Sequence, residues 1–175
     1  MSNDVKHIAV DVVIIMGVSG SGKTTLAKRL AEEIGFCFID ADDYHSKAAK
    51  LMMENGEPLT ESQRQPWVNR LCQTLHSFSM EKKRCVLAFS GLKFRHRDKF
   101  RELGFNTTFI FLNADYSIIE SRITQRSEHF FEPKLLLSQF DDLELPLQEN
   151  DVIMIDNSND IEKTLETTMN EIYTD

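Results

Sequence analysis

Residues 17–24 match in full the eight-residue pattern of phosphate-binding loops, G-x-x-x-x-G-K-[ST], and spell Gly-Val-Ser-Gly-Ser-Gly-Lys-Thr. The loop lies between a β-branched apolar run at 10–16 and a stretch with helical apolar spacing that ends at Gly35. This order suits the chemistry, because glycines let successive backbone N–H groups face phosphate oxygens and the following helix adds its positive dipole. The segment therefore predicts a nucleotide-phosphate site between a strand and a helix.

The residue types of the loop predict individual roles. Lys23 is expected to neutralise the β- and γ-phosphates, and the hydroxyl of Thr24 is expected to ligate Mg²⁺. On its own the loop indicates ATP or GTP without choosing between them. The nucleotide-binding residues predicted from it are Gly17, Ser19, Gly20, Ser21, Gly22, Lys23, Thr24 and Thr25.

The remaining chain alternates between strand-like and helix-like segments. Apolar strands are expected at 10–16, 36–39, 85–89, 107–112 and 152–155. Helices are expected after the phosphate loop, twice within 44–80 with the second opening at Pro66, after Asp115, from Pro133, and at 161–172. This alternation predicts βαβ units, hence an α/β fold with a parallel sheet flanked by helices. Without a repeat, a low-complexity block or a linker, residues 1–175 are expected to form a single domain.

Bulk composition narrows the partners and the compartment. The 175 residues carry a net charge of −8, so we expect neither nucleic acid nor a membrane as a partner. Three cysteines, Cys37, Cys72 and Cys85, share no metal-ligand spacing and are expected to be reduced and mostly buried. The apolar run at 12–16 is too short for a signal or a span, which favours a cytoplasmic protein.

Two carboxylates follow the second predicted strand directly. Because ligands bind outside the carboxyl ends of strands in such sheets, Asp40 and Asp42 are expected to face the nucleotide. Asp40 suits Mg²⁺ held through water, and Asp42 suits a catalytic role, accepting a proton from or orienting an attacking hydroxyl. The neighbouring Asp43 is expected to have no such role.

Beyond these residues, the chain resembles the gluconate kinase (gluconokinase) family of small P-loop kinases, related in fold to shikimate and adenylate kinases. The likeness runs from Met16 to about Pro146. Its further markers are Asp40-Ala41-Asp42-x-x-His45, Gly56-Glu57-Pro58-Leu59, Arg64-x-Pro66-Trp67, Ser90-x-Leu92-Lys93 with Arg97-Asp98, Arg122-x-x-x-Arg126-x-x-His129-Phe130, and Ser138-Gln139-Phe140. The resemblance implies transfer of the ATP γ-phosphoryl group to the 6-hydroxyl of D-gluconate, five parallel strands, a mobile lid at about 124–134, an acceptor-binding helical segment at 44–80 and a homodimer.

The resemblance also assigns residues outside the loop. It implies that Arg122 and Arg126 bind the nucleotide, with Arg126 stabilising the transferred phosphoryl group. Cationic and hydrogen-bonding side chains suit a sugar acid, since arginine forms a bidentate fork with a carboxylate and lysine a compact charge. The implied substrate-binding residues are Asp42, His45, Arg64, Lys93, Arg97 and His129.

The chain departs from the family pattern on the acceptor side, at Ser46, Ala49, Met52, Gly91 and Glu128. Two alternatives to a gluconate kinase therefore stand. One is a related kinase whose acceptor is shikimate, another sugar acid or a nucleotide. The other is an ATP-binding module whose acceptor site has decayed.

Overall fold

The computed structural model describes residues 8–125, 133–158 and 160–173, which build one five-stranded sheet flanked by helices. The strands are β1 (Val12–Met16), β2 (Cys37–Asp40), β3 (Cys85–Ala88), β4 (Thr107–Asn113) and β5 (Val152–Asp156). The helices are α1 (Lys23–Ile34), the 3₁₀ helix η1 (Ala41–Tyr44), α2 (Lys47–Glu54), α3 (Glu61–Met80), α4 (Phe94–Arg101), α5 (Tyr116–Gln125), α6 (Pro133–Asp142) and α7 (Ile161–Ile172).

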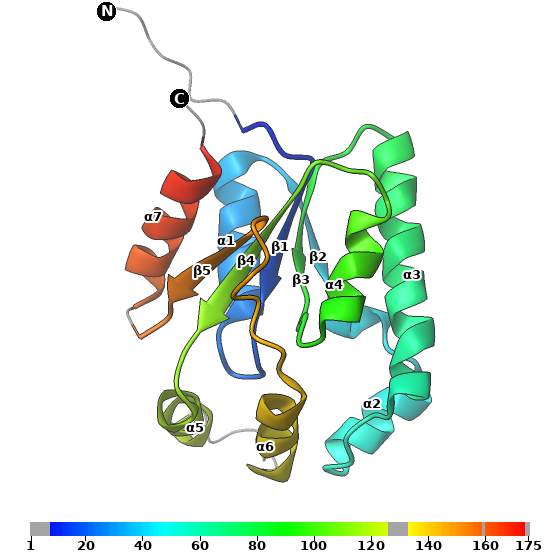
Figure 1. The fold of residues 1–175 in the computed structure, drawn as a ribbon, viewed down its shortest axis with the longest axis vertical. Coiled ribbons are helices and arrows are strands. Elements are labelled where there is room, and N and C mark those ends of the chain that lie inside the picture. Colours follow the sequence, from blue (N-terminus) through cyan, green and yellow to red (C-terminus); the bar gives the residue numbers. More distant parts are fainter. Residues whose placement is uncertain (1–7, 126–132, 159, 174–175) are drawn as a thin grey trace, which may run out of the picture.

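All strand pairs are parallel, in the order β2-β3-β1-β4-β5, which confirms the α/β class and the parallel sheet. In the register of the central strand, Ile14 lies opposite Leu87 on one side and Phe109 on the other. Helices α1 and α7 cover one face of the sheet, and α3 and α4 cover the other (Figure 1).

The central strand β1 explains why its sequence is an unbroken apolar run. Val13 and Ile15 pack into the core under α1 and α7, whereas Val12, Ile14 and Met16 pack into the core under α3 and α4. Every residue of β1 is buried, because a parallel strand with helices on both faces has no solvated side. Such a strand fixes the position of the loop that follows it.

Helix α3 begins earlier than the sequence predicted. The second helix of the 44–80 segment was expected to open at Pro66, but it starts at Glu61 and contains Pro66 in its interior. The start is set by Thr60, whose backbone N–H donates to the side chain of Gln63 at 2.8 Å, a capping-box contact. Because Pro66 lies within the second turn, its missing N–H removes only one helical hydrogen bond.

The carboxyl ends of the strands meet at one edge of the sheet. Figure 1 shows the arrowheads of the strands at this edge, with α2, α5 and α6 gathered beyond it. The segments that follow β1, β2 and β3 carry the phosphate loop, the acidic pair and Ser90. Within the described part of the chain, no helix combines the length and apolarity needed to cross a bilayer.

The cysteines depart in part from their expectation. Cys85 is buried in β3 and Cys72 is partly buried in α3, but Cys37 at the start of β2 is exposed. None of the three forms a disulfide. The edge position of β2 explains the difference, since the sheet order leaves this strand with one neighbour.

Candidate active site

The phosphate loop joins β1 to α1 and takes its shape from glycines with left-handed backbone angles. Gly20 has φ 78°, and a Cβ there would lie 2.6 Å from Cγ1 of Ile123 on α5. Gly22 has φ 89° and is the N-cap residue of α1. Since only glycine adopts these angles without strain, the backbone can curl closely around an anion at the helix N-terminus.

Lys23 is the first residue of α1 and lies at the centre of the loop. Its Nζ donates to the backbone carbonyl of Val18 at 2.9 Å. Burial lowers the pKa of Lys23, and the carboxylates of Asp42 and Asp40 oppose that shift. The ammonium is thus held inside the loop, with acidic groups as its electrostatic partners.

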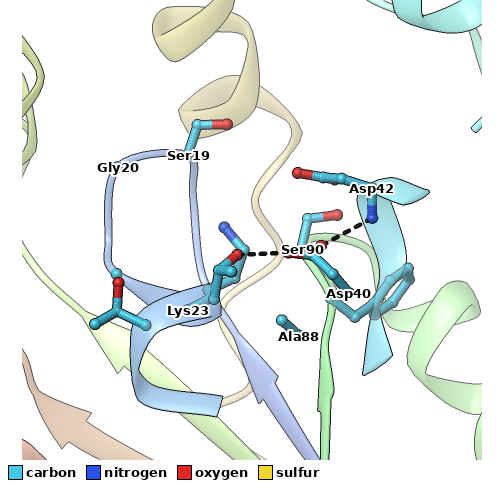
Figure 2. A pocket seen from close by; sticks show the side chains of 11 residues that line it. Ser19, Gly20, Lys23, Asp40, Asp42, Ala88 and Ser90 are labelled. Atoms are coloured by element: carbon cyan, nitrogen blue, oxygen red, sulfur yellow. Dashed lines mark hydrogen bonds between the residues drawn. The ribbon is translucent and has the colours of Figure 1, made fainter. Parts of the chain in front are cut away.

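Asp40, at the end of β2, links the acidic pair to the loop. Thr24 Oγ1 donates to Asp40 Oδ2 at 2.9 Å, and the backbone N–H of Asp42 donates to Asp40 Oδ1 at 3.0 Å (Figure 2). Among the described residues, no three His, Cys, Asp or Glu side chains converge on a metal position. The neighbouring Thr24 hydroxyl and Asp40 carboxylate are the donor types that suit Mg²⁺, which commonly binds few protein oxygens together with phosphates.

A cavity of about 150 Å³ lies between the loop and the ends of β2 and β3. Figure 2 shows Lys23 and Asp42 pointing into it from opposite sides, with Ser90 between them. It is lined by Ser19, Gly20, Gly22, Lys23, Thr24, Thr25, Asp40, Asp42, Ala88, Phe89 and Ser90. The structure therefore brings six of the eight predicted loop residues together with both carboxylates.

Asp42 has a raised pKa in this cavity. Desolvation raises the pKa of Asp42, Lys23 opposes the rise, and the charges of Asp40 and Asp43 add to it. A carboxylate with a raised pKa is a better proton acceptor than an ordinary one. The geometry and the pKa thus both support a catalytic Asp42.

A second, larger cavity of about 810 Å³ adjoins the first. Its wall on the loop side contains Ser19, Lys23, Asp42 and Ser90, which also line the first cavity. The remaining wall consists of Asp43, His45, Lys50, Met53, Glu54, Pro58, Leu59, Arg64, Trp67, Leu92, His96, Leu135, Ser138 and Gln139. A molecule in the larger cavity would therefore meet the phosphate site at Lys23 and Asp42.

His45 lies on the wall of the larger cavity and is held by Trp67. The two rings stack with centroids 4.1 Å apart, and Trp67 Nε1 donates to the carbonyl of Ala41 at 2.7 Å. Burial, with help from Lys50, Arg70 and Arg64, lowers the pKa of His45 to about 4. Its Nδ1 is buried and has no hydrogen-bond partner among the described residues. His45 is thus a neutral ring that can bind a hydroxyl.

Arg64 and Lys93 converge, but on a carboxylate of the protein. Arg64 Nη2 lies 2.7 Å from Asp142 Oδ2, and Lys93 Nζ lies 2.9 Å from Asp142 Oδ1. Arg64 lines the larger cavity, whereas Lys93 and Asp142 do not. The predicted pair of cations therefore exists, with Arg64 as the member that borders the cavity.

The structure assigns Arg97 a different place from the one implied by the resemblance. Its side chain is 1% exposed and lines neither cavity. Its guanidinium donates to both carboxylate oxygens of Glu149 and to the carbonyls of Gly91 (2.6 Å) and Glu144 (3.1 Å). We therefore correct its role: Arg97 ties α4 to the segment before β5 and does not reach a substrate.

Three predicted residues of the lid region have different outcomes. Arg122 on α5 donates to the carbonyl of Asn157 at 2.6 Å and lines neither cavity. Arg126 and His129 lie outside the described residues.

Gly17 and Ser21 belong to the phosphate loop but do not line either cavity. The backbone carbonyl of Ser21 accepts a hydrogen bond of 2.6 Å from Asn157 Nδ2.

Gln139 is a site residue that the sequence argument did not assign. From α6 it accepts the backbone N–H of Ser19 at 2.6 Å and donates to Ser19 Oγ at 2.8 Å. Its only sequence signal was its place within the family marker Ser138-Gln139-Phe140. Ser90, which lines both cavities, had a similar marker signal and no assigned role.

The departures from the family pattern that fall on described residues lie outside the cavity wall. Ser46 caps α2, its Oγ accepting the N–H of Ala49 at 3.1 Å, and Met52 Sδ accepts from Gln63 Nε2 at 3.3 Å. Gly91 has φ 58°, and a Cβ there would lie 2.3 Å from Met16 Sδ, so a larger residue would not fit. None of these four lines either cavity, and Glu128 lies outside the described residues.

Known proteins resemble the chain over nearly its whole length. A family model described as an AAA domain matches residues 12–145. The thermoresistant gluconokinase of Escherichia coli (strain K12) is 35% identical over 159 residues, covering 90% of this chain and 91% of that protein. A solved gluconokinase from Sinorhizobium meliloti 1021 superposes with a TM-score of 0.86 at 30% identity, covering 95% of this chain and 93% of that one. A shikimate kinase from Bacteroides thetaiotaomicron, at 19% identity and a TM-score of 0.65 over 93% of this chain and 98% of that one, shares the fold.

Proposed function

This chain belongs to the gluconokinase family, and we propose that it transfers the γ-phosphoryl group of ATP to the 6-hydroxyl of D-gluconate, giving 6-phosphogluconate and ADP. The observation that carries the proposal is the wall shared by the two cavities. Lys23 and Asp42 border both the phosphate site and the larger cavity, so an acceptor hydroxyl and a terminal phosphate can meet there.

The nucleotide binds through the phosphate loop. Backbone N–H groups of residues 22–25, at the N-terminus of α1, face the phosphate oxygens, and Lys23 exchanges its contact with the Val18 carbonyl for a phosphate. This exchange replaces a neutral acceptor with a charged one, which strengthens the hydrogen bond.

Mg²⁺ fits beside the loop. Thr24 and, through water, Asp40 would hold it, since their oxygens already lie 2.9 Å apart. When bound, the ion supplies charge neutralisation for the phosphate oxygens.

The acceptor binds in the larger cavity with its 6-hydroxyl towards Asp42. Asp42 orients this hydroxyl and takes its proton as the oxygen attacks the γ-phosphorus. The bond from that phosphorus to the bridging oxygen breaks, and ADP leaves with the electron pair. The raised pKa of Asp42 suits a group that must accept a proton in this step.

The far end of gluconate is bound by the segment 44–80. His45 offers a neutral ring to the row of hydroxyl groups. Arg64 offers positive charge to the gluconate carboxylate, and Lys93, which shares the partner Asp142 with Arg64, adds to that charge. Binding the acceptor at both ends fixes its reactive hydroxyl near the phosphate, which lowers the entropic part of the barrier.

The described cavity wall still carries the polar and charged side chains Asp42, His45 and Arg64, which a decayed acceptor site would have lost. Ser46, Ala49, Met52 and Gly91 have structural roles in helix capping and packing and do not line the cavity. These positions therefore provide no reason to set gluconate aside.

The proposal also includes the lid, the homodimer and the cytoplasmic location predicted from the sequence. A lid at about 124–134, with Arg126 on the transferred phosphoryl group and His129 on the substrate, stays a proposal because Arg126 and His129 lie outside the described residues. Arg122 stays a proposed nucleotide contact from α5. The homodimer stays a prediction that light scattering can check. Three cysteines without disulfides favour a reducing compartment, and we place the enzyme in the cytoplasm.

An acceptor screen tests the proposal. The purified protein with Mg²⁺ and ATP is offered gluconate, other sugar acids, shikimate and nucleosides, and ADP formation is followed by a coupled assay. We expect turnover with gluconate well above the acceptor-free rate. Turnover with another acceptor but not with gluconate would refute the substrate and keep the kinase, and ATP binding without any turnover would refute both.

A further inference from the structure

Asp142, the last residue of α6, forms ion pairs with Arg64 and Lys93, the two cations that the proposed function assigns to the acceptor carboxylate. Each of its oxygens faces one cation: Oδ2 lies 2.7 Å from Arg64 and Oδ1 lies 2.9 Å from Lys93. Desolvation raises the pKa of Asp142, but the hydrogen bonds from Lys93 and Arg64 outweigh it and lower that pKa below its ordinary value. The carboxylate is therefore ionised at neutral pH and bound at both oxygens.

This contact adjoins the acceptor cavity through Arg64 and α6. Arg64 borders the larger cavity, and among the described residues Asp142 is the only carboxylate within ion-pair distance of it. Helix α6, which carries Asp142, also contributes Ser138 and Gln139 to the cavity wall. The Arg64, Lys93 and Asp142 side chains are 15%, 21% and 27% exposed. Because the cluster is partly shielded from water, its charges interact more strongly than they would at the open surface.

We propose that Asp142 is a specificity-determining residue whose carboxylate competes with the carboxylate of the acceptor for Arg64 and Lys93. This inference rests on the proposed function, because it takes the acceptor to be a sugar acid bound near Arg64. An internal carboxylate reduces the net charge of the cluster from two positive units to one. The site is thereby weakened for acidic acceptors and left unchanged for neutral polyols of the same shape.

If Asp142 instead positions Arg64 and Lys93 for the acceptor, its removal has the opposite effect on acceptor binding. If Asp142 only held Arg64 and Lys93 in their working positions, its removal would release them and weaken acceptor binding. If it competes, its removal frees a charged pair for the acceptor and strengthens binding. The sign of the change in KM for the acceptor therefore distinguishes competition from support.

The test compares Asp142→Asn with Asp141→Asn, a matched control on the neighbouring exposed carboxylate of α6. Steady-state rates are measured with gluconate and with gluconamide, the neutral amide of the same acid, and KM for ATP and Tm are recorded. We expect Asp142→Asn to lower KM for gluconate roughly 3- to 10-fold. KM for gluconamide and for ATP should stay within about 2-fold, as both should in Asp141→Asn.

Each other outcome decides against the inference. A raised KM for gluconate shows that Asp142 positions the cations, and an unchanged one shows that it does not compete. An equal fall for gluconamide shows that the effect does not depend on the acceptor carboxylate. Failure of the proposed function is separate: the wild type would then turn over another acid in place of gluconate, and the same comparison of that acid with its amide applies, whereas no turnover at all overturns both.

Discussion

Gln139 on α6 and Ser19 in the phosphate loop form a reciprocal pair of hydrogen bonds, although 120 residues separate them. Ser19 N–H donates to Gln139 Oε1 at 2.6 Å, and Gln139 Nε2 donates to Ser19 Oγ at 2.8 Å. Because Gln139 also lines the larger cavity, one side chain fastens the wall of the acceptor site to the nucleotide loop.

Replacing Gln139 with alanine removes both hydrogen bonds and leaves the Ser19 N–H without this partner. We expect a loss of about 1–2 kcal/mol in the free energy of unfolding, since partly buried hydrogen bonds contribute about 1 kcal/mol each. For a chain of this size the Tm should fall by about 4 °C, as measured by scanning calorimetry. Gln73→Ala on the exposed surface of α3 is the control and should change Tm by less than about 1 °C. Equal Tm values for the two variants would show that the Ser19 contact adds nothing.

Replacing Lys23 with methionine removes the ammonium held at the centre of the loop. We expect kcat to fall at least about 100-fold, because the charge of the transferred phosphoryl group loses its nearest cationic partner. Lys28→Met, on the exposed side of the same helix, is the matched control and should keep wild-type activity. Comparable losses in both variants, followed in the coupled assay, would contradict a specific role for Lys23.

Arg64 and Arg97 are both arginines of the family pattern, and the structure gives them separable roles. Arg64→Ala should raise KM for gluconate about 10-fold or more with a small change in Tm, because Arg64 borders the cavity. Arg97→Lys should lower the free energy of unfolding by about 2 kcal/mol, because a lysine cannot bond Glu149 and the Gly91 and Glu144 carbonyls together. Its KM for gluconate should stay near the wild-type value. A raised KM without a Tm change in Arg97→Lys would restore Arg97 to the substrate site.

His45 should make stability depend on pH below neutrality. Burial lowers its pKa from 6.5 to about 4, so between these pH values the unfolded chain binds a proton that the folded chain does not. The free energy of unfolding therefore falls as pH drops from 6.5 towards 4. His45→Gln should lose less Tm between pH 7.5 and pH 5 than the wild type, with His76→Gln, an exposed histidine on α3, as the control. Identical pH slopes in wild type and His45→Gln would contradict the buried neutral ring.

The parts of the molecule that followed from sequence are those set by local chemistry. The β-branched run of β1, the glycines of the loop and Gly35 at the end of α1 determine structure within a few residues, and all appear as expected. The start of α3 was misplaced because the prediction used Pro66 as the helix start, whereas the Thr60–Gln63 capping box sets it at Glu61. Local patterns therefore predicted the strand, the loop and the helix of this unit well.

The parts that did not follow depend on distant partners. The family resemblance placed Arg97 at the substrate. Its actual partner Glu149 lies 52 residues away, and nothing in the run 93–97 marks which side chains become buried. The same holds for Asp142, whose carboxylate is brought to Arg64 and Lys93 by the packing of α6. Such pairings arise from tertiary structure, and a single sequence does not reveal them.

The most direct test of phosphoryl transfer at the shared wall is the rate of 6-phosphogluconate formation by Asp42→Asn. The control is Asp141→Asn, an exposed carboxylate of α6 outside both cavity walls. Asparagine keeps the size of the side chain but cannot accept the proton of the 6-hydroxyl. At saturating ATP and gluconate we expect the wild type and Asp141→Asn to react at equal rates, each forming one 6-phosphogluconate for every ADP. Asp42→Asn should do so at least about 100-fold more slowly with ATP binding retained. A wild-type rate in Asp42→Asn, or ADP formed without 6-phosphogluconate by the wild type, would contradict the account.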